Sequence, residues 1–294
     1  MKSVGGLRAL FMRSETARGF SLLSPTLALL ICGLLAPIIV LIGLSFWKQN
    51  GMAFEPALSL DNYFFFFEKR IYPLILIRSL KISAFVTLAT VLLAYPAAYF
   101  IAFKVHKNKL IWLILITVPF WTSYLLRVFA WKIMLGYNGV INSGLMGMEL
   151  ISEPLSFILH SEFAVILTLA HAWAAFAILP IYVSLEKIDR SLLEAAADLG
   201  ETPFMSFLRV TLPLSLPGVI AASLLVFIPT VGDYVTPKLV GGSGGIMIGN
   251  LIQNAFGKGT NWPLGATISV VSMLSITLLV CLFLWGLGQL KKRL

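Results

Sequence analysis

Charged side chains and cysteine are scarce in this sequence. Of its 294 residues only 12% are Asp, Glu, Lys or Arg, while 59% are hydrophobic; an average soluble protein carries about twice that charged fraction. So few charges cannot cover a water-facing surface, which argues against a soluble enzyme, a disordered chain and a nucleic-acid-binding domain. Cys32 and Cys281 both lie inside apolar runs, which excludes a disulfide scaffold and a thiolate metal cage.

Motifs for ATP binding and intramembrane catalysis are also absent. No G-x-x-x-x-G-K-[ST] motif occurs, so we do not expect this chain to hold ATP phosphates. The GGSGG run at 241–245 lacks the lysine of such a loop and is interpreted as a flexible linker. No H-E-x-x-H motif, close pair of histidines or nucleophile elbow is present. We therefore expect neither a catalytic residue nor a metal site.

Long apolar stretches, in contrast, are abundant. A helix needs about 20 apolar residues to cross the hydrocarbon core of a bilayer. The first stretch is longer than the roughly 7–15 residues of a secretory signal, so we expect it to remain as an anchor. The sequence predicts an all-α polytopic membrane protein with a six-helix domain at 24–287, between a cytoplasmic segment 1–23 and a basic cytoplasmic tail 288–294. The predicted spans are 24–47, 82–103, 110–126, 163–183, 215–235 and 264–287.

The distribution of Lys and Arg predicts the orientation. If the N-terminus is inside, the inner segments hold thirteen basic residues in 67 positions and the outer segments nine in 98. This bias matches the positive-inside rule and places both termini in the cytoplasm. Residues 127–136 continue the third span with two embedded charges, and we expect an amphipathic extension at the outer surface or lining a cavity.

The cytoplasmic loop between the fourth and fifth spans has helix start and stop signals in order. Asp189 or Ser191 can cap a first helix, which Gly200 ends. Thr202 can cap a second helix with Pro203 in its first turn. We expect Pro213 to force Leu212 out of helical geometry and close the second helix. The predicted hairpin at 186–213 is nearly neutral, which argues against a DNA-binding helix-turn-helix.

The residues of this hairpin resemble the EAA loop of ABC importer permeases. The resemblance rests on Glu194-Ala195-Ala196, then Gly200, then Val210-Thr211-Leu212-Pro213, with Val210 where the family pattern has Ile. It implies the fold of a type I ABC importer permease and makes the hairpin a coupling helix that docks on a cytoplasmic ATPase subunit. The coupling residues implied are Glu194, Ala195, Ala196, Gly200, Leu212 and Pro213.

Two further segments resemble the spermidine/putrescine permeases. They are Pro119 to Trp131 and Leu224 to Pro263, and the similarity extends over about residues 22–290. The resemblance implies two ATPase subunits that bind ATP and Mg, a second and homologous permease, and an extracytoplasmic solute-binding protein. It also implies a multi-pass protein of the bacterial inner membrane, with no cofactor in this chain. The solute is expected to be a polyamine or another small amine, opine or amino-acid-like compound.

Asp233 is the one acidic residue inside a predicted span, near its outer end. A charge in hydrocarbon is costly, so the carboxylate should face a cavity or a partner. It could attract a cationic solute or cap irregular backbone, and Arg127 could be its ion-pair partner. His171, within span four, is interpreted as a helix-packing hydrogen bonder. The predicted substrate path comprises Trp121, Tyr124, Arg127, Trp131, Asp233 and Tyr234.

Two other function classes remain as alternatives. A secondary transporter or channel driven by an ion gradient would not need the hairpin motif and would show inverted repeats. No convincing internal repeat is present. A membrane-embedded enzyme would need a nucleophile–base pair or a metal cluster, and the sequence offers neither.

Overall fold

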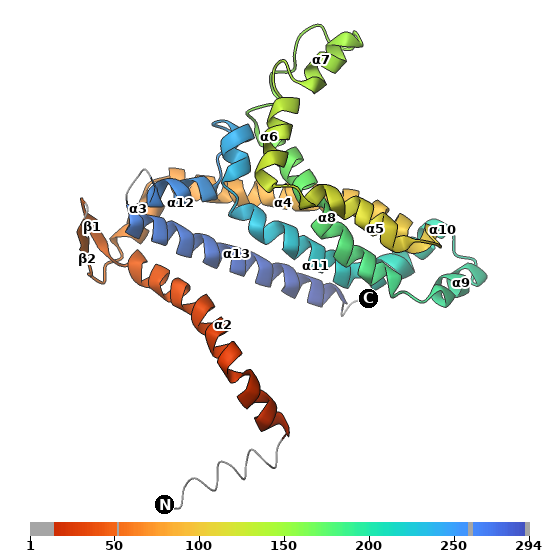
Figure 1. Cartoon of the computed structure of the whole chain (residues 1–294), viewed down its shortest axis with the longest axis horizontal. Coiled ribbons are helices and arrows are strands. Elements are labelled where there is room, and N and C mark those ends of the chain that lie inside the picture. Colours follow the sequence, from red (N-terminus) through yellow and green to blue (C-terminus); the bar gives the residue numbers. More distant parts are fainter. Residues whose placement is uncertain (1–14, 52, 258–260, 292–294) are drawn as a thin grey trace, which may run out of the picture.

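A computed structural model of the chain describes residues 15–51, 53–257 and 261–291, and helices dominate these residues. Three long helices pack side by side at the centre (Figure 1). Ile82, Leu169 and Val226 lie in their shared core and are wholly buried. In the helix Glu162–Glu186, five of the buried residues are alanines, whose small side chains let helix backbones approach closely. These helices are α4 (Ile71–Tyr99), α8 (Glu162–Glu186) and α11 (Leu212–Val231).

Two more long helices, α2 (Glu15–Ser45) and α13 (Trp262–Lys291), lie beside this centre. α2 contacts α13 near its C-terminal end and diverges from the other helices (Figure 1). Its leucine and isoleucine side chains are mostly exposed. Such a surface is suited to lipid acyl chains, which are as apolar as the side chains themselves. α2 begins before the predicted span 24–47 and ends two residues short of its end, whereas α13 extends beyond the predicted span 264–287 at both ends.

The structure contains five or six candidate spans, depending on how the third predicted span is counted. Five helices are long and apolar enough to cross a membrane, and a sixth span results if one bent helix pair is taken as a unit. The bent pair lies at 109–134, where the sequence predicted a single helix at 110–126. The five other candidates match the five other predicted spans. The segments 1–14 and 292–294 of the predicted cytoplasmic ends lie outside the described residues.

The end of the bundle opposite the predicted coupling hairpin carries short elements. A second apolar cluster packs two of these elements, through Phe66 and Ile248, against Ile75 of α4 and Ile268 of α13. A two-stranded antiparallel hairpin projects from this end (Figure 1). The elements are β1 (Lys48–Asn50), β2 (Ala53–Glu55), α3 (Asp61–Glu68), a π-helical turn at Pro237–Gly241 and α12 (Ile248–Phe256).

The third span is broken rather than continuous. α5 (Lys109–Thr117) passes into a 3₁₀ turn (Val118–Trp121), and α6 (Tyr124–Met134) then leaves at 82°. Pro119 lacks an N–H group, and Thr122 and Ser123 are extended, so the helix cannot continue. α6 and the short α7 (Val140–Gly147) project sideways from the bundle (Figure 1). The span predicted over 110–126 is therefore a bent pair of helices rather than one helix, and α6 covers most of the predicted extension at 127–136.

The second span begins eleven residues before the predicted residue 82, because α4 starts at Ile71. Arg78 and Lys81, which the sequence placed in an outer loop, lie on this helix. Their side chains reach Glu162 at the start of α8, with N···O distances of 3.7 Å each. The pairing explains how two basic residues are accommodated in a helix that is otherwise apolar here.

The GGSGG run is a packed turn, which contradicts its interpretation as a flexible linker. Gly241 and Gly245 are buried, and the N–H of Gly245 donates to the carbonyl of Gly241 at 2.8 Å. Gly242 has φ +57°, and a Cβ there would lie 2.8 Å from the backbone oxygen of His160. Arg78 donates to the Ser243 carbonyl at 3.3 Å. Glycine is required here by close backbone approach, which its sequence pattern does not distinguish from flexibility.

Candidate functional site

The predicted coupling hairpin forms at one end of the bundle. Its first helix, α9 (Arg190–Asp198), starts after Asp189, whose side chain accepts from the Ser191 N–H at 3.0 Å. This hydrogen bond from the backbone lowers the pKa of Asp189 below its ordinary value, so the cap is charged at neutral pH. A negative charge also suits the positive end of the helix dipole. Of the two predicted caps, Asp189 is the one that forms.

The turn of the hairpin is a Schellman motif. Gly200 has φ +84°, its N–H donates to Ala197, and the N–H of Glu201 donates to Ala196. Thr202 then accepts from the Met205 N–H at 3.3 Å and caps the second helix, α10 (Pro203–Ser206). Arg209 forms an ion pair with Glu201 across the turn. The predicted start and stop signals are confirmed at this turn.

The end of the hairpin differs from the prediction. Leu212 keeps helical geometry with φ −63° and ψ −48°, and α10 continues through a π-helical turn (Phe207–Thr211) into α11. The wider turn lets the N–H of Leu212 bond to Phe207, and Pro213 lies in the first turn of α11, where a missing N–H costs little. The prediction that Pro213 closes the second helix is therefore wrong. The hairpin is continuous with the helix that follows it.

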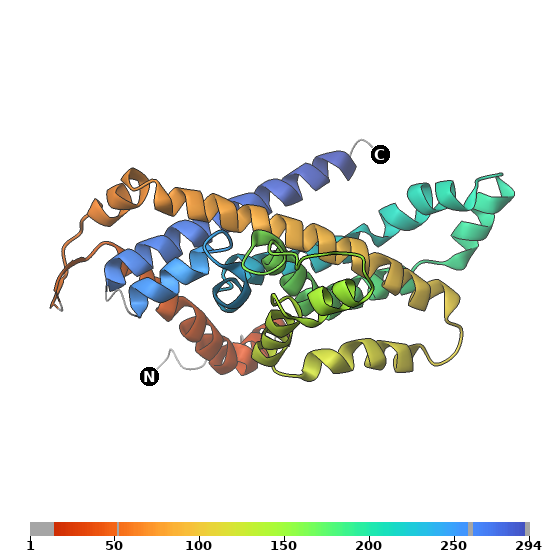
Figure 2. The same ribbon diagram turned by 90° about the horizontal axis from the view of Figure 1, so that it is seen from above.

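Two large apolar side chains are exposed at the tip of the hairpin. Leu199 is 86% and Phe204 67% exposed, both close to the turn at Gly200. Glu194 and Ala195 are exposed on α9, whereas Ala196 is buried against the hairpin itself. The view from above shows α9 and α10 extending past the other helices (Figure 2). Leu212 and Pro213 lie at the half-buried base, so the six predicted coupling residues divide between an exposed tip and a packed base.

The base of the hairpin is held tightly to the bundle. Gly218 of α11 packs directly on α8, and its N–H donates to the Ser184 hydroxyl at 3.1 Å. Tyr95 of α4 hydrogen-bonds Ser215 at 2.7 Å, and its ring lies edge-on to Phe207. These contacts connect both arms of the hairpin to the central helices, so a displacement of the hairpin would move the base with it.

A second group of predicted residues gathers where α5 bends into α6. Arg127 donates through Nη1 to the carbonyl oxygens of Phe120 at 2.7 Å and Thr122 at 3.2 Å. These carbonyls lack helical partners because of the bend. The guanidinium lies 5.3 Å from the centre of the Phe120 ring, and its buried Nε has no hydrogen-bond partner. Arg127 forms no ion pair with Asp233; it completes the bend instead.

Asp233 lies just after α11, which ends at Val231, and is tied to α6. Tyr124 Oη donates to Asp233 Oδ2 at 2.6 Å and is 2.6 Å from Thr236 Oγ1. Asp233 Oδ1 accepts from the Val235 N–H at 3.0 Å. The carboxylate therefore caps the irregular backbone, and it has no Lys or Arg nitrogen within 4.0 Å among the described residues. Its negative charge remains unpaired.

The other predicted path residues occupy the same region in different ways. Trp131 Nε1 donates to His171 Nδ1 at 3.2 Å, and His171 also lies against Phe120. This makes His171 a hydrogen bonder between α6 and α8, as the sequence suggested. Trp121 is 79% exposed on the bend, and Tyr234 is exposed beside Asp233. We name Tyr124, Arg127, Trp131, His171 and Asp233 the bend site.

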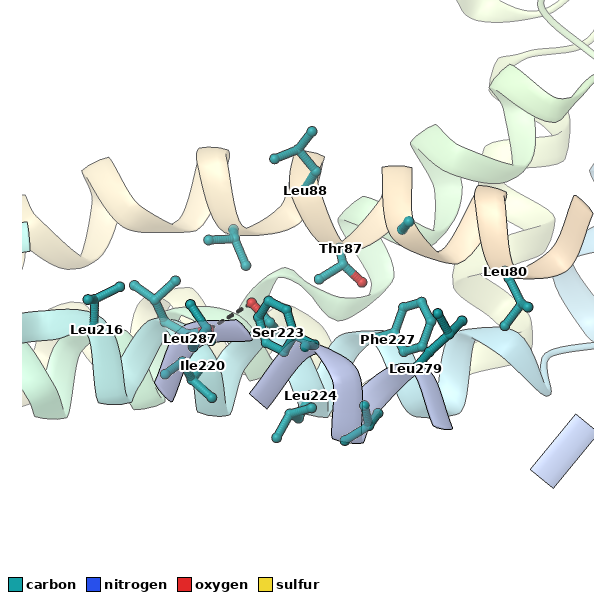
Figure 3. Close-up of a pocket in the computed structure, with 15 residues that line it drawn as sticks. Leu80, Thr87, Leu88, Leu216, Ile220, Ser223, Leu224, Phe227, Leu279 and Leu287 are labelled. Atoms are coloured by element: carbon teal, nitrogen blue, oxygen red, sulfur yellow. Dashed lines mark hydrogen bonds between the residues drawn. The ribbon is translucent and has the colours of Figure 1, made fainter. Parts of the chain in front are cut away.

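A large apolar groove lies away from the bend site, between α4, α11 and α13 (Figure 3). Its volume is about 510 Å³. Thr87 and Ser223 are its polar lining residues, and their hydroxyls donate to carbonyls of their own helices at 2.7 and 2.8 Å. The groove offers almost no free hydrogen-bonding group to a polar solute. The described residues also contain no group of three His, Cys, Asp or Glu placed to hold a metal ion.

Sequence reasoning missed two contributors to these sites. Sequence reasoning used Lys109 only as one of the basic residues that indicate orientation. In the structure it forms an ion pair with Glu186 at the base of the hairpin. Gly218 carried no local signal, because the atoms that exclude a side chain there come from α8, more than thirty residues earlier.

Comparison with known proteins gives consistent results. Residues 29–294 match the family described as binding-protein-dependent transport system inner membrane component. The chain is 36% identical over 256 residues to the spermidine/putrescine transport system permease protein PotB of Haemophilus influenzae, covering 86% of this chain and 88% of the relative. It is 35% identical to PotB of Escherichia coli, covering 87% and 93%, and 34% identical to the inner membrane ABC transporter permease protein YdcU of the same species, covering 77% and 75%.

Solved structures show the fold. One chain of a bacterial ABC transporter that imports the acidic polysaccharide alginate superposes with a TM-score of 0.68 at 17% identity, covering 96% of this chain and 98% of that one. A chain of the alginate transporter in complex with its periplasmic protein superposes with a TM-score of 0.65 at 18% identity, covering 90% and 91%. The fold is that of a type I importer permease, and the family match favours the importer over the ion-gradient alternative. The chain belongs to the family of inner membrane components of binding-protein-dependent transport systems.

Proposed function

We propose that this chain is one of two homologous permease subunits of an ABC importer, and that the hairpin at 186–213 docks on a cytoplasmic ATPase. The observation that carries the proposal is the hairpin itself. Its exposed apolar tip, with Leu199 and Phe204, projects beyond the bundle, and its base is continuous with α8 and α11. An apolar protrusion of this kind suits insertion into a groove of a partner. Two ATPase subunits would bind and hydrolyse ATP with Mg, and this chain would hold no cofactor.

The proposed orientation places the hairpin and both termini in the cytoplasm. α13 runs from the end with the strands toward the end with the hairpin (Figure 1). The bias of Lys and Arg toward the predicted inner segments supports the same arrangement. A solute-binding protein would then dock at the end that carries β1, β2, α3 and α12.

We propose a polyamine as the solute. PotB of two species carries this substrate in its name and shares more than a third of its residues with this chain over most of its length. The bend site supports a cation because the Asp233 carboxylate lacks a basic partner, while the rings of Tyr124 and Tyr234 lie next to it in the chain or in space. Charge pairing and cation–π contact would both favour an amine.

The experiment is ATP hydrolysis by the purified complex, reconstituted in lipid with its binding protein. The solutes are putrescine, spermidine, a betaine, an amino acid and an opine-like conjugate. Stimulation by a polyamine alone is the expected result. Stimulation only by a neutral or anionic solute would contradict the polyamine, and the absence of a co-purifying ATPase would contradict the importer.

Asp233→Asn tests the bend site. Asparagine keeps one side-chain oxygen that can accept from the Val235 N–H, and its amide nitrogen can donate to the Tyr124 hydroxyl, so the cap is retained while the attraction for a cation is lost. We expect polyamine uptake to fall about tenfold, close to the loss of one hydrogen bond to a charged group, while basal ATPase activity persists. Tyr124→Phe is the matched variant that weakens the cap without changing the charge. Uptake by Asp233→Asn at the wild-type rate would leave the carboxylate only its capping role.

A further inference from the structure

One ammonium group joins three helices directly beneath the hairpin. Lys109, the first residue of α5, places Nζ at 2.7 and 2.8 Å from the two carboxylate oxygens of Glu186. The same Nζ donates to the carbonyl of Ala102 at 2.9 Å. Ala102 lies in the π-helical turn (Phe100–Lys104) that ends α4, and Glu186 is the last residue of α8. Lys109 is partly shielded, with 21% of its side chain exposed.

This position explains why a cation is needed. The C-terminal ends of α4 and α8 both present unpaired carbonyl groups and the negative end of a helix dipole. Glu186 would be unfavourable at such an end without a partner, because its charge has the same sign as the dipole there. Lys109 neutralises Glu186 and satisfies one carbonyl of α4, so the two helix ends and the start of α5 meet at a single charge.

The ion pair connects two segments of the chain that belong to different sites. Glu186 precedes the N-cap of α9, Asp189, by three residues, so it stands at the root of the hairpin. Lys109 starts the helix that ends in the bend with Arg127 and Tyr124. None of the α5 side chains, all within the described part of the chain, is buried, so packing holds this helix weakly. Its attachment to the hairpin root depends on the ion pair more than on apolar contact.

We infer that the Lys109–Glu186 pair transmits movement of the hairpin to α5 and thereby to the bend site. The inference rests on the proposed function and adds two positioning residues to it. Without the pair, the hairpin still moves with α8 and α11 through its packed base, but α5 no longer follows. Hydrolysis of ATP then continues while solute transfer is lost.

The test is charge reversal in the reconstituted complex with its ATPase and binding protein. Lys109→Glu and Glu186→Lys are each expected to lower uptake per inserted molecule about tenfold, with ATPase activity retained, which corresponds to a typical coupling free energy between sites. The double variant, with both charges exchanged, is expected to recover at least about half of the uptake because the attraction is restored. Recovery stays incomplete, since a glutamate at 109 cannot donate to Ala102.

Lys107→Glu is the matched control. Lys107 is exposed in the same loop and takes part in none of the ion pairs of the described residues, so the same charge change there should leave uptake unchanged. Lys109→Gln and Glu186→Gln provide milder variants if charge reversal prevents insertion. Wild-type uptake by the single charge-reversal variants would overturn the inference. So would a double variant that transports no better than either single variant. Failure of the wild-type complex to associate with an ATPase would instead count against the proposed function.

Discussion

Gly200→Asp is expected to abolish uptake while the protein still inserts in the membrane. Gly200 has φ +84°, where a residue with a Cβ costs about 1–2 kcal/mol. No atom lies within 4 Å of a Cβ built there, so the side chain would point away from the hairpin toward a docked ATPase. An unpaired charge buried in such an interface costs several kcal/mol, so docking should weaken about a hundredfold. Uptake and co-purification of the ATPase measure the effect.

Two further variants separate charge from backbone strain. Asparagine has the shape of aspartate and tolerates the left-handed conformation, so Gly200→Asn should retain most of the uptake. Gly51 also has positive φ, at +63°, and a Cβ added there would have no atom within 4 Å, but it lies in the strand hairpin at the opposite end. Gly51→Asp should therefore leave ATPase binding unchanged. Normal ATPase binding and uptake in Gly200→Asp would refute the coupling role of the hairpin.

The coupling hairpin was the part of the molecule most accessible to sequence reasoning. Its caps and its turn are local: Asp189, Gly200 and Thr202 each act on backbone groups within a few residues. The same reasoning failed at Pro213, because a proline can mark either the end of one helix or the first turn of the next, and the sequence does not distinguish the two. In the structure a π-helical turn before Pro213 joins the two helices into one, and no local sequence pattern predicts that turn.

Sequence reasoning predicted only part of the bend site. The two charges embedded in residues 127–136 indicated a departure from a plain span, but the 82° angle between α5 and α6 could not be inferred. The sequence left Arg127 as one candidate ion-pair partner of Asp233. In the structure the bend leaves two carbonyl oxygens without partners, and these occupy the guanidinium instead. The partner of Asp233 is a tyrosine hydroxyl 109 residues away, which only the tertiary fold brings close.

The second large effect is expected for Gly218. A Cβ built at this position lies 2.5 Å from the carbonyl oxygen of Pro180 and 2.5 Å from Cβ of Ser184, both on α8. Contacts this short force α8 and α11 apart at the base of the hairpin. Overpacking in a core costs about 1–3 kcal/mol for small additions, so Gly218→Ala should lower stability by that amount and Gly218→Val by more. The melting temperature in detergent and uptake per inserted molecule are the measurements.

A double variant tests the cause. Ser184→Gly removes one of the two obstructing groups, but the Pro180 carbonyl belongs to the backbone and cannot move without bending α8. Ser184→Gly combined with Gly218→Ala should therefore remain defective. Gly43 in α2 supplies the control, since a Cβ there has no atom within 4 Å, and Gly43→Ala should be neutral or slightly stabilising. If Gly218→Ala melts and transports like the wild type, α8 and α11 can separate without cost, and the hairpin base is not the rigid connection between ATPase and bundle that the coupling mechanism requires.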